Sequence, residues 1–226
     1  MILSHEHKFI FLCNGKTGTT SVRAALDDYH EGEEYEVGVP GLYEDKHVPP
    51  AVLKGMLGPH IWEEYFTCCF VRNPWDWFVS QFFWNQSPNP ISKKKMLRKP
   101  IETTKEYLTK RRKRQYLEDL EAFTPEEIYE TYDILRDYRG IHQADSLFQY
   151  HYVYDADGTR LVDHVGRFER IDEDFQRMVD QVGIEAQLPH RNPTSHRSYR
   201  TYYNSETRRL IRDLYSVDVE TFGYSF

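Results

Sequence analysis

The residues best suited to chemistry gather in one short turn near the N-terminus, residues 14–21, which reads Asn-Gly-Lys-Thr-Gly-Thr-Thr-Ser. The turn combines two glycines, a lysine and several hydroxyls, and it separates an apolar run from a helical pattern. Backbone N–H groups at the start of a helix attract anions, and glycine lets the main chain approach a ligand closely. We therefore predict a site for a phosphate-like anion, to which Lys16 contributes a positive charge. The alternative is an ordinary turn between a strand and a helix.

A second group of polar residues follows the apolar run 66–71. Arg72 comes directly after this run, and its planar guanidinium suits bidentate contact with a phosphate. Ligands of open α/β sheets bind beyond the carboxyl ends of the strands, so Arg72 and the first turn share one edge if their strands are neighbours. Ser80 lies away from the apolar stripe of the next helix, on the side of Asp76, and could face the ligand. Alternatively, Arg72 forms an ion pair with Asp76 and Ser80 faces solvent.

The surrounding pattern predicts strands that alternate with helices. The apolar runs 8–13 and 66–71 are typical of buried strands in a parallel sheet, and a third strand is expected near 164–168. Asn73 followed by Pro74 is a typical helix start. Further helices are expected over 50–57, after the capping box at 124–127, from Asp172, and around 210–215. We expect an α/β fold in which residues 1–226 form one domain, with a mostly parallel central sheet flanked by helices, similar to P-loop proteins.

The composition restricts the class of protein. With 226 residues, 39% of them hydrophobic, the chain is expected to fold into a packed globule. A net charge of −7 argues against a general nucleic-acid binder. No apolar run approaches the roughly 18–20 residues of a membrane span, and the three cysteines indicate buried, reduced thiols. We expect a cytoplasmic protein with no membrane span and, because zinc-site spacing is absent from the sequence, no metal.

Together, the two polar groups resemble the sulfotransferases that use 3′-phosphoadenosine 5′-phosphosulfate (PAPS). Lysine followed by Gly-Thr-Thr-Ser at 18–21 resembles their 5′-phosphosulfate loop. Phe-Val-Arg-Asn-Pro-Trp-Asp at 70–76, with a serine eight residues after the arginine, resembles their 3′-phosphate motif. Residues 166–169 and 222–224 are similar to the carbohydrate branch, which includes the heparan 2-O-sulfotransferase type and its bacterial relatives. Gly15 departs from the pattern, since many relatives have proline there.

The resemblance implies a role for each matching residue. Lys16 binds the 5′-phosphosulfate and stabilises the leaving oxygen, whereas Arg72 and Ser80 hold the 3′-phosphate. Ser195 and Arg197 belong to a segment that resembles a loop closing over the nucleotide. Five consecutive residues line the cradle for the phosphosulfate: Thr17, Gly18, Thr19, Thr20 and Ser21.

The implied reaction moves a sulfuryl group from PAPS to an acceptor hydroxyl, expected to be a carbohydrate hydroxyl, and releases adenosine 3′,5′-bisphosphate. A general base must remove the hydroxyl proton, and a histidine with its pKa of about 6.5 suits that task. His47 lies between the two motifs, and the resemblance implies that it is the base, with His60 and Glu44 as further candidates. Alternatively, His47 caps a helix or faces water. The basic segment 93–114 could attract an anionic glycan or simply be a solvated surface.

Two other functions stay open. Gly15-Lys16-Thr17 looks like the end of the kinase pattern G-x-x-x-x-G-K-[ST], but the glycine required five residues before Gly15 is Ile10. This departure speaks against a nucleotide or small-molecule kinase. A non-catalytic module for adenosine nucleotides or glycans would retain Arg72 and Ser80 but could dispense with Lys16 and His47. The presence of both favours an enzyme.

Overall fold

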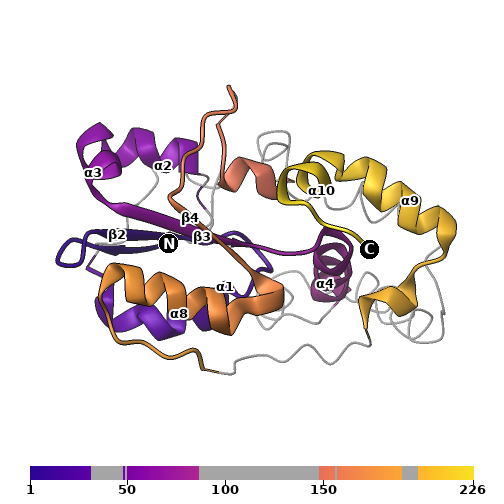
Figure 1. Cartoon of the computed structure of the whole chain (residues 1–226), viewed down its shortest axis with the longest axis horizontal. Coiled ribbons are helices and arrows are strands. Elements are labelled where there is room, and N and C mark those ends of the chain that lie inside the picture. The colour runs from indigo at the N-terminus through magenta and orange to yellow at the C-terminus, as the bar shows by residue number, and fades with distance from the viewer. Residues whose placement is uncertain (32–47, 49, 87–147, 156, 190–197) are drawn as a thin grey trace, which may run out of the picture.

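A four-stranded sheet forms the centre of the protein, for which a computed structural model describes residues 1–31, 48, 50–86, 148–155, 157–189 and 198–226 (Figure 1). The strands lie in the order β1 (Ile2–Ser4), β2 (Phe9–Leu12), β3 (Phe66–Val71) and β4 (His164–Arg167). β1 is antiparallel to β2, whereas β2, β3 and β4 run parallel. The predicted α/β architecture with a mostly parallel sheet is confirmed, and β1 is a strand that the sequence pattern did not predict.

Helices cover both faces of this sheet. α1 (Thr19–Leu26) and α8 (Ile171–Val182) lie on one face, and α2 (Pro50–Leu57) and α3 (Pro59–Glu64) lie on the other (Figure 1). Side chains alternate along a strand. Phe9 and Phe11 of β2 therefore belong to the core beneath α1 and α8, while Ile10 and Leu12 belong to the core beneath α2 and α3. Burial on both faces explains why the strand reads as a continuous apolar run.

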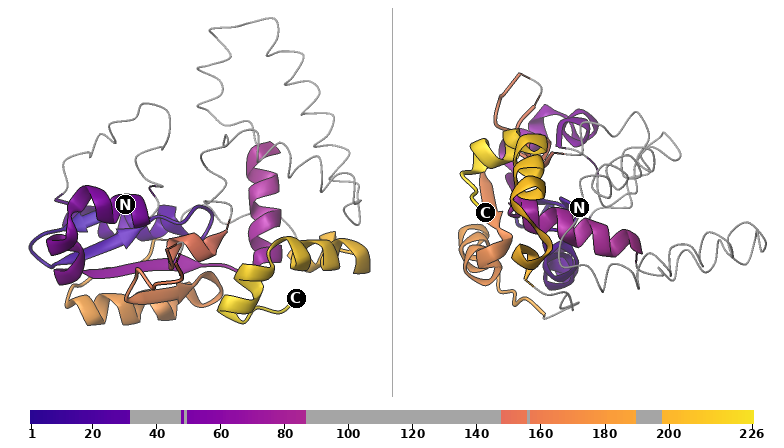
Figure 2. Two further views of the ribbon diagram at one scale, coloured as in Figure 1. Left: turned by 90° about the horizontal axis from the view of Figure 1, so that it is seen from above. Right: turned by 90° about the vertical axis from the view of Figure 1, so that its right-hand side faces the viewer.

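A third apolar cluster lies beyond the carboxyl ends of β2 and β3. It is formed by α4 (Pro74–Gln86), α9 (Ser205–Leu214) and α10 (Ser216–Phe222), and Figure 2 shows α4 rising away from the sheet where β3 ends. Its buried members are Trp75, Trp77, Phe78, Val79, Ile211 and Tyr215. Four short 3-10 helices complete the described elements: η1 (Asp27–Tyr29), η3 (Gln149–Tyr152), η4 (Phe168–Arg170) and η5 (Tyr199–Tyr202).

The predicted start of α4 is confirmed. Pro74 is its first residue, and the side-chain oxygen of Asn73 accepts a hydrogen bond from the N–H of Trp75 at 3.1 Å. The helix expected after 124–127 and the basic segment 93–114 lie outside the described residues. Among the described residues, no helix is both long and apolar enough to cross a membrane.

Asp218 of α10 fixes the start of η3. Its carboxylate is only 1% exposed and accepts hydrogen bonds from the N–H groups of Gln149 and Tyr150, at 3.0 and 2.8 Å. Both N–H groups lie in the first turn of η3, which has no earlier helical carbonyl to bind. Burial raises the pKa of Asp218 to about 6, even though the two hydrogen bonds favour the charged form.

This carboxyl predicts a pH dependence of stability. The pKa of Asp218 is higher in the folded protein than in the unfolded chain, so the folded state binds more protons between about pH 4 and 6. The contribution of Asp218 to the free energy of unfolding therefore falls by up to about 3 kcal/mol as pH rises through this window. Denaturant unfolding of the wild type and of Asp218→Asn should give a difference, wild type minus variant, that decreases with pH. A difference independent of pH would contradict the assignment.

Candidate anion-binding site

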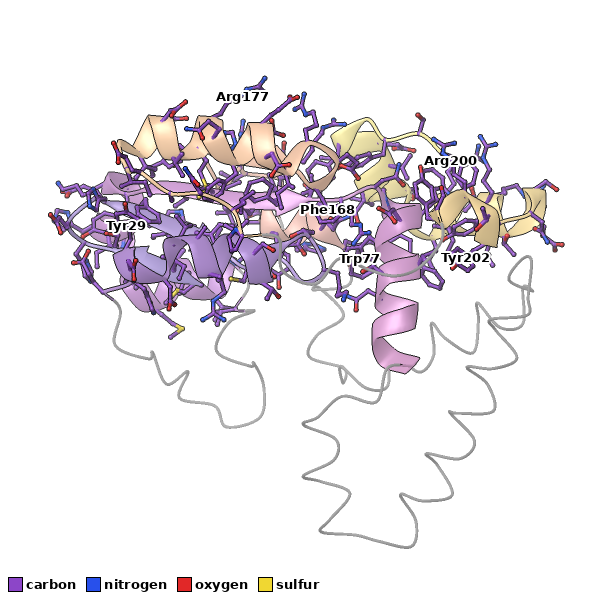
Figure 3. The ribbon with its side chains drawn as sticks, turned by 90° about the horizontal axis from the view of Figure 1, so that it is seen from below. Tyr29, Trp77, Phe168, Arg177, Arg200 and Tyr202 are labelled. Carbon is purple, nitrogen blue, oxygen red and sulfur yellow. The ribbon has the colours of Figure 1, made fainter. Side chains whose placement is uncertain are left out.

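The turn that follows β2 has an unusual backbone, held by side-chain contacts. Lys16 and Gly18 both have left-handed conformations, with φ of 65° and 84°. The buried hydroxyl of Thr17 donates to the carbonyl of Asn14 at 2.7 Å, and the indole N–H of Trp77 donates to the carbonyl of Gly15 at 2.8 Å. The first contact lies within the turn, and the second joins the turn to α4. Figure 3 shows Trp77 in the region between the sheet and that helix. The turn is therefore more than a simple connection between a strand and a helix.

The predicted cradle residues differ in exposure. Thr17 and Thr19 are buried, Ser21 is half-buried, and Thr20 is exposed. Thr17 directs its hydroxyl proton into the turn, so its main-chain N–H is the group that it could offer to an anion. α1 starts directly after Gly18, and its N-terminus has no side-chain cap. Uncapped N–H groups at a helix start are suited to an anion.

Gly18 allows the start of α8 to pack against the turn. A Cβ atom at this position would lie 2.3 Å from Cδ1 of Ile171 and 3.2 Å from Cδ2 of Phe168. Glycine is therefore needed both for its positive φ and for the close approach of these side chains.

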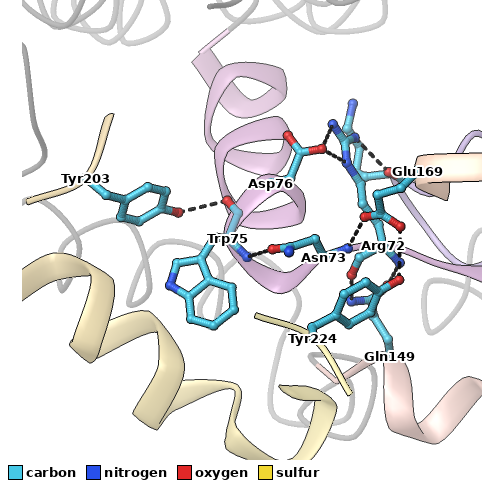
Figure 4. Close-up of polar contacts among 9 residues, drawn as sticks. Arg72, Asn73, Trp75, Asp76, Gln149, Glu169, Tyr203 and Tyr224 are labelled. Atoms are coloured by element: carbon cyan, nitrogen blue, oxygen red, sulfur yellow. Dashed lines mark hydrogen bonds and ion pairs between the residues drawn. The ribbon is translucent and has the colours of Figure 1, made fainter. Parts of the chain in front are cut away.

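Arg72 lies against the turn, as the register of the sheet requires. Its Nη1 donates to the main-chain carbonyl of Lys16 at 3.1 Å, and its guanidinium stacks on the ring of Phe168, 4.1 Å from the centroid. The expectation that the two polar groups share one edge is confirmed. The ion pair of the alternative interpretation is also present, since Nε and Nη2 each lie 2.9 Å from Oδ2 of Asp76 (Figure 4). The Arg72 side chain is 4% exposed, so these contacts fix its position.

Two positive charges are thus held close together. Burial, and then repulsion from Arg72, lower the pKa of Lys16 to about 8, so its ammonium is still mostly protonated at pH 7. Bringing like charges together is unfavourable in the absence of a ligand, and an anion that contacts both would relieve the repulsion. The electrostatics of the edge therefore favour binding of an anion.

Ser80 is buried in α4, the helix that begins two residues after Arg72. It lies one helical turn after Asp76, is 2% exposed, and its Oγ has no hydrogen-bond partner within the described part of the chain. The alternative in which Ser80 faces solvent is therefore wrong. Because α4 also buries Trp77 and Gln81, its buried surface is wider than the single apolar stripe expected from the sequence. A buried hydroxyl without a partner is uncommon and calls for an explanation.

Sequence reasoning missed several residues that support the site. Trp77 was not assigned to the site from the sequence, because its contact with the turn depends on tertiary packing. Glu169 follows β4 and accepts hydrogen bonds from the N–H of Asn73, at 2.5 Å, and from the hydroxyl of Tyr224, at 3.1 Å. Glu169 and Tyr224 belong to segments that were noted only as a resemblance. Gln149 gave no signal at all, and it contacts both Asn14 and Arg72.

Some predicted site residues cannot be placed. His47, Glu44, Ser195 and Arg197 lie outside the described residues. His60 is exposed on α3 and pairs with Glu64 at 3.3 Å. Because α3 precedes β3, His60 lies toward the opposite edge of the sheet from the turn. In the described ranges, no group of three or more histidine, cysteine, aspartate or glutamate residues is arranged to hold a metal ion.

Comparison with known proteins gives one finding. A family model described as "Sulfotransferase family" matches residues 1–225. No match was found among the curated proteins or among the solved structures.

The packing of Gly18 leads to a stability prediction with a built-in control. Gly18→Ala should lower the free energy of unfolding by the cost of a left-handed alanine, about 1–2 kcal/mol, because φ is 84°. Displacing the Ile171 methyl and crowding Phe168 should add about 1 kcal/mol. Gly183→Ala is the matched control, since Gly183 has φ of 77° but no atom within 4 Å of an added Cβ. Equal losses for the two variants, measured by denaturant unfolding, would refute the packing argument.

Proposed function

Because the chain belongs to the sulfotransferase family, we propose that it transfers a sulfuryl group from PAPS to a hydroxyl of an acceptor by in-line displacement. The observation that carries the proposal is the 3.1 Å hydrogen bond from Arg72 to the carbonyl of Lys16. It joins two motifs that are 56 residues apart in sequence into one cationic site at the carboxyl edge of the sheet. A nucleotide with anionic groups on both its 3′ and 5′ positions needs two such groups of donors.

The residues at this edge fit the nucleotide. We assign Lys16 and the cradle Thr17 to Ser21 to the 5′-phosphosulfate, and Arg72 with Ser80 to the 3′-phosphate. A guanidinium has five N–H groups, and its contacts with Asp76 and Lys16 engage three of them at most. The hydroxyl of Ser80, which has no partner among the described residues, supports the same assignment, because a phosphate oxygen would give it one. By resemblance alone, Ser195 and Arg197 are further contacts of the nucleotide.

The proposed chemistry uses a base and a cation on opposite sides of the transferred group. The acceptor oxygen attacks sulfur, its proton passes to His47, and the bond from sulfur to the phosphate oxygen breaks. Lys16 stabilises the negative charge that develops on that oxygen. Val48, the residue after His47, is buried in the apolar cluster that contains Leu12 and Val71, the last residues of β2 and β3. His47 itself lies outside the described residues, and its proposed role as the base rests on the resemblance.

A carbohydrate acceptor, of the heparan 2-O type, rests on the two segments that resemble that branch. In the structure these segments contact one another. The hydroxyl of Tyr224 donates to Glu169 at 3.1 Å, and the guanidinium of Arg167 stacks on the Tyr224 ring at 4.8 Å. They form one unit next to Asn73, which supports reading them as a single feature of the family branch.

The kinase alternative is weakened by the position of Ile10. This residue is buried inside β2, where it pairs with Thr67 of β3, so the required glycine of a kinase phosphate loop is replaced by a strand residue. The binding-module alternative is tested directly by turnover.

The proposed function is tested by two measurements on the unmodified chain. In a thermal-shift panel, adenosine 3′,5′-bisphosphate should raise the melting temperature more than AMP or ATP with magnesium. Incubation with labelled PAPS and a panel of glycans, lipids and tyrosine peptides should then add a sulfo group to one class, detected by mass spectrometry. Stabilisation by ATP with magnesium alone would favour a kinase. Binding of the bisphosphate with no transfer to any acceptor would favour a binding module.

The two catalytic assignments predict different losses. His47→Ala should lower turnover by about 10²–10⁴-fold, because general base catalysis typically contributes that much. It should still bind adenosine 3′,5′-bisphosphate with an affinity near that of the wild type. Lys16→Ala should lose both turnover and affinity, since Lys16 contacts the donor. Both effects are measured by labelled-sulfo transfer and by calorimetry.

Matched controls come from exposed residues far from the edge. His60→Ala and Lys8→Ala remove surface side chains that pair with Glu64, so both should leave turnover unchanged. Near-normal turnover in His47→Ala would remove His47 from the role of base.

A substitution at Ser80 should affect the affinity for adenosine 3′,5′-bisphosphate without lowering the free energy of unfolding. Ser80→Ala removes a buried hydroxyl that has no partner in the ranges the structure describes, so the free energy of unfolding should stay the same or rise by about 1 kcal/mol. Affinity for adenosine 3′,5′-bisphosphate should fall about tenfold, as expected for one lost hydrogen bond to a charged group. Ser4→Ala is the control, because Ser4 donates to Glu31 at 2.7 Å and lies at the far edge strand. That variant should lose stability and retain affinity; the reverse pattern would count against the assignment of Ser80.

A further inference from the structure

The side chain of Gln149 completes the end of β3 in place of a strand. Its Oε1 accepts a hydrogen bond from the N–H of Arg72 at 2.7 Å, and its Nε2 donates to the carbonyl of the same residue at 2.7 Å (Figure 4). Gln149 is 1% exposed, so water does not compete for these bonds. The main chain of Arg72 is therefore held by one amide side chain from a distant segment.

The same amide reaches the anion-binding turn. Nδ2 of Asn14, the first residue of the turn, donates to the carbonyl of Phe70 at 3.0 Å and lies 3.4 Å from Oε1 of Gln149. The carbonyl of Asn14 in turn accepts the hydroxyl proton of Thr17. Gln149 thus contacts the residue that anchors the turn and the residue that carries the second cation.

Gln149 is itself held in place from behind. Its own N–H, and that of Tyr150, donate to the buried carboxylate of Asp218 in α10. The amide therefore has little freedom to move without breaking several buried hydrogen bonds. A rigid support of this kind is what precise placement of two charged groups requires.

We propose that Gln149 is a positioning residue, which fixes the turn at 14–18 relative to Arg72 and thereby sets the separation of the Lys16 and Arg72 charges. The effect of Gln149 on PAPS binding rests on the proposed function, whereas its effect on the separation of the two charges does not. Only an amide of this length supplies both the acceptor and the donor that Arg72 needs. Asparagine is one methylene too short to make both bonds, and methionine fills the space without either.

The test uses Gln149→Met in the full chain, with two readouts. The first is the dissociation constant of adenosine 3′,5′-bisphosphate by calorimetry, which should rise at least tenfold. The second is the pKa of Lys16, measured without nucleotide from the pH dependence of its reaction with an amine-modifying reagent and read by peptide mass spectrometry. When the turn moves away from Arg72, the smaller of the two causes that lower this pKa is relieved, so the pKa should rise above about 8, while burial, the larger cause, still holds it below its ordinary value of 10.5.

Thr67→Val is the matched control. Thr67 is buried in β3, the strand that Arg72 follows. Its hydroxyl contacts Leu161 and Asp163 at the end of β3 that lies away from Arg72. This variant should lose stability yet leave the pKa of Lys16 unchanged and the dissociation constant within twofold. If Gln149→Met does not fold, Gln149→Asn gives the same two readouts with a smaller loss of contacts.

The outcomes separate the two proposals. A raised pKa of Lys16 together with weaker binding supports the positioning role. An unchanged pKa of Lys16 in a folded Gln149 variant overturns that role, whatever the affinity. Failure of the wild-type chain to bind the bisphosphate would instead overturn the proposed function, and the pKa of Lys16 would still decide whether Gln149 positions the turn.

Discussion

The parallel pairing of β2 with β3 is the constraint on which the site depends. Phe9 pairs with Phe66 and Leu12 with Cys69, so the turn after β2 and the residue after β3 reach the same edge. A shift of one residue would exchange the two faces of a strand and bury the wrong side chains. Because both faces are covered by helices, the core holds the register firmly. The contact between Arg72 and the carbonyl of Lys16 is a direct result of that register.

The carboxyl edge of the sheet gathers several features that are uncommon in stable proteins. Two cations lie close together, two residues of one turn, Lys16 and Gly18, have positive φ, and the Ser80 hydroxyl is buried without a partner in the described structure. The closeness of the like charges and the buried Ser80 hydroxyl each cost stability, and a bound anion that contacts these groups would offset both costs. Departures from local rules that gather at one place are characteristic of functional sites. The surrounding aromatic contacts, Trp77 to the turn and Phe168 under Arg72, supply the rigidity that such an arrangement needs.

The sequence was informative where structure is local. Residues 66–71 form β3 as predicted, Asn73 caps α4, and the meeting of the turn with Arg72 follows from the strand pattern. β1 escaped notice because three residues carry too little periodicity. Gln149 could not have been identified, since its partners lie 77 and 135 residues away and a lone glutamine has no pattern. The burial of Ser80 depends on how α4 packs beyond the sheet, which a helical stripe does not describe.

One contact of Asn73 has a consequence for the order in which the protein is assembled. Its side-chain N–H group donates to the carbonyl of Ser225, 152 residues later, at 2.8 Å. The neighbouring Tyr224 reaches Glu169, which holds the N–H of Asn73. A growing polypeptide on the ribosome therefore contains β1, β2 and β3 long before it contains all the residues that form these hydrogen bonds. Asn73 can therefore make its main-chain contact once Glu169 has been synthesised, but its side-chain contact only after translation has passed residue 225.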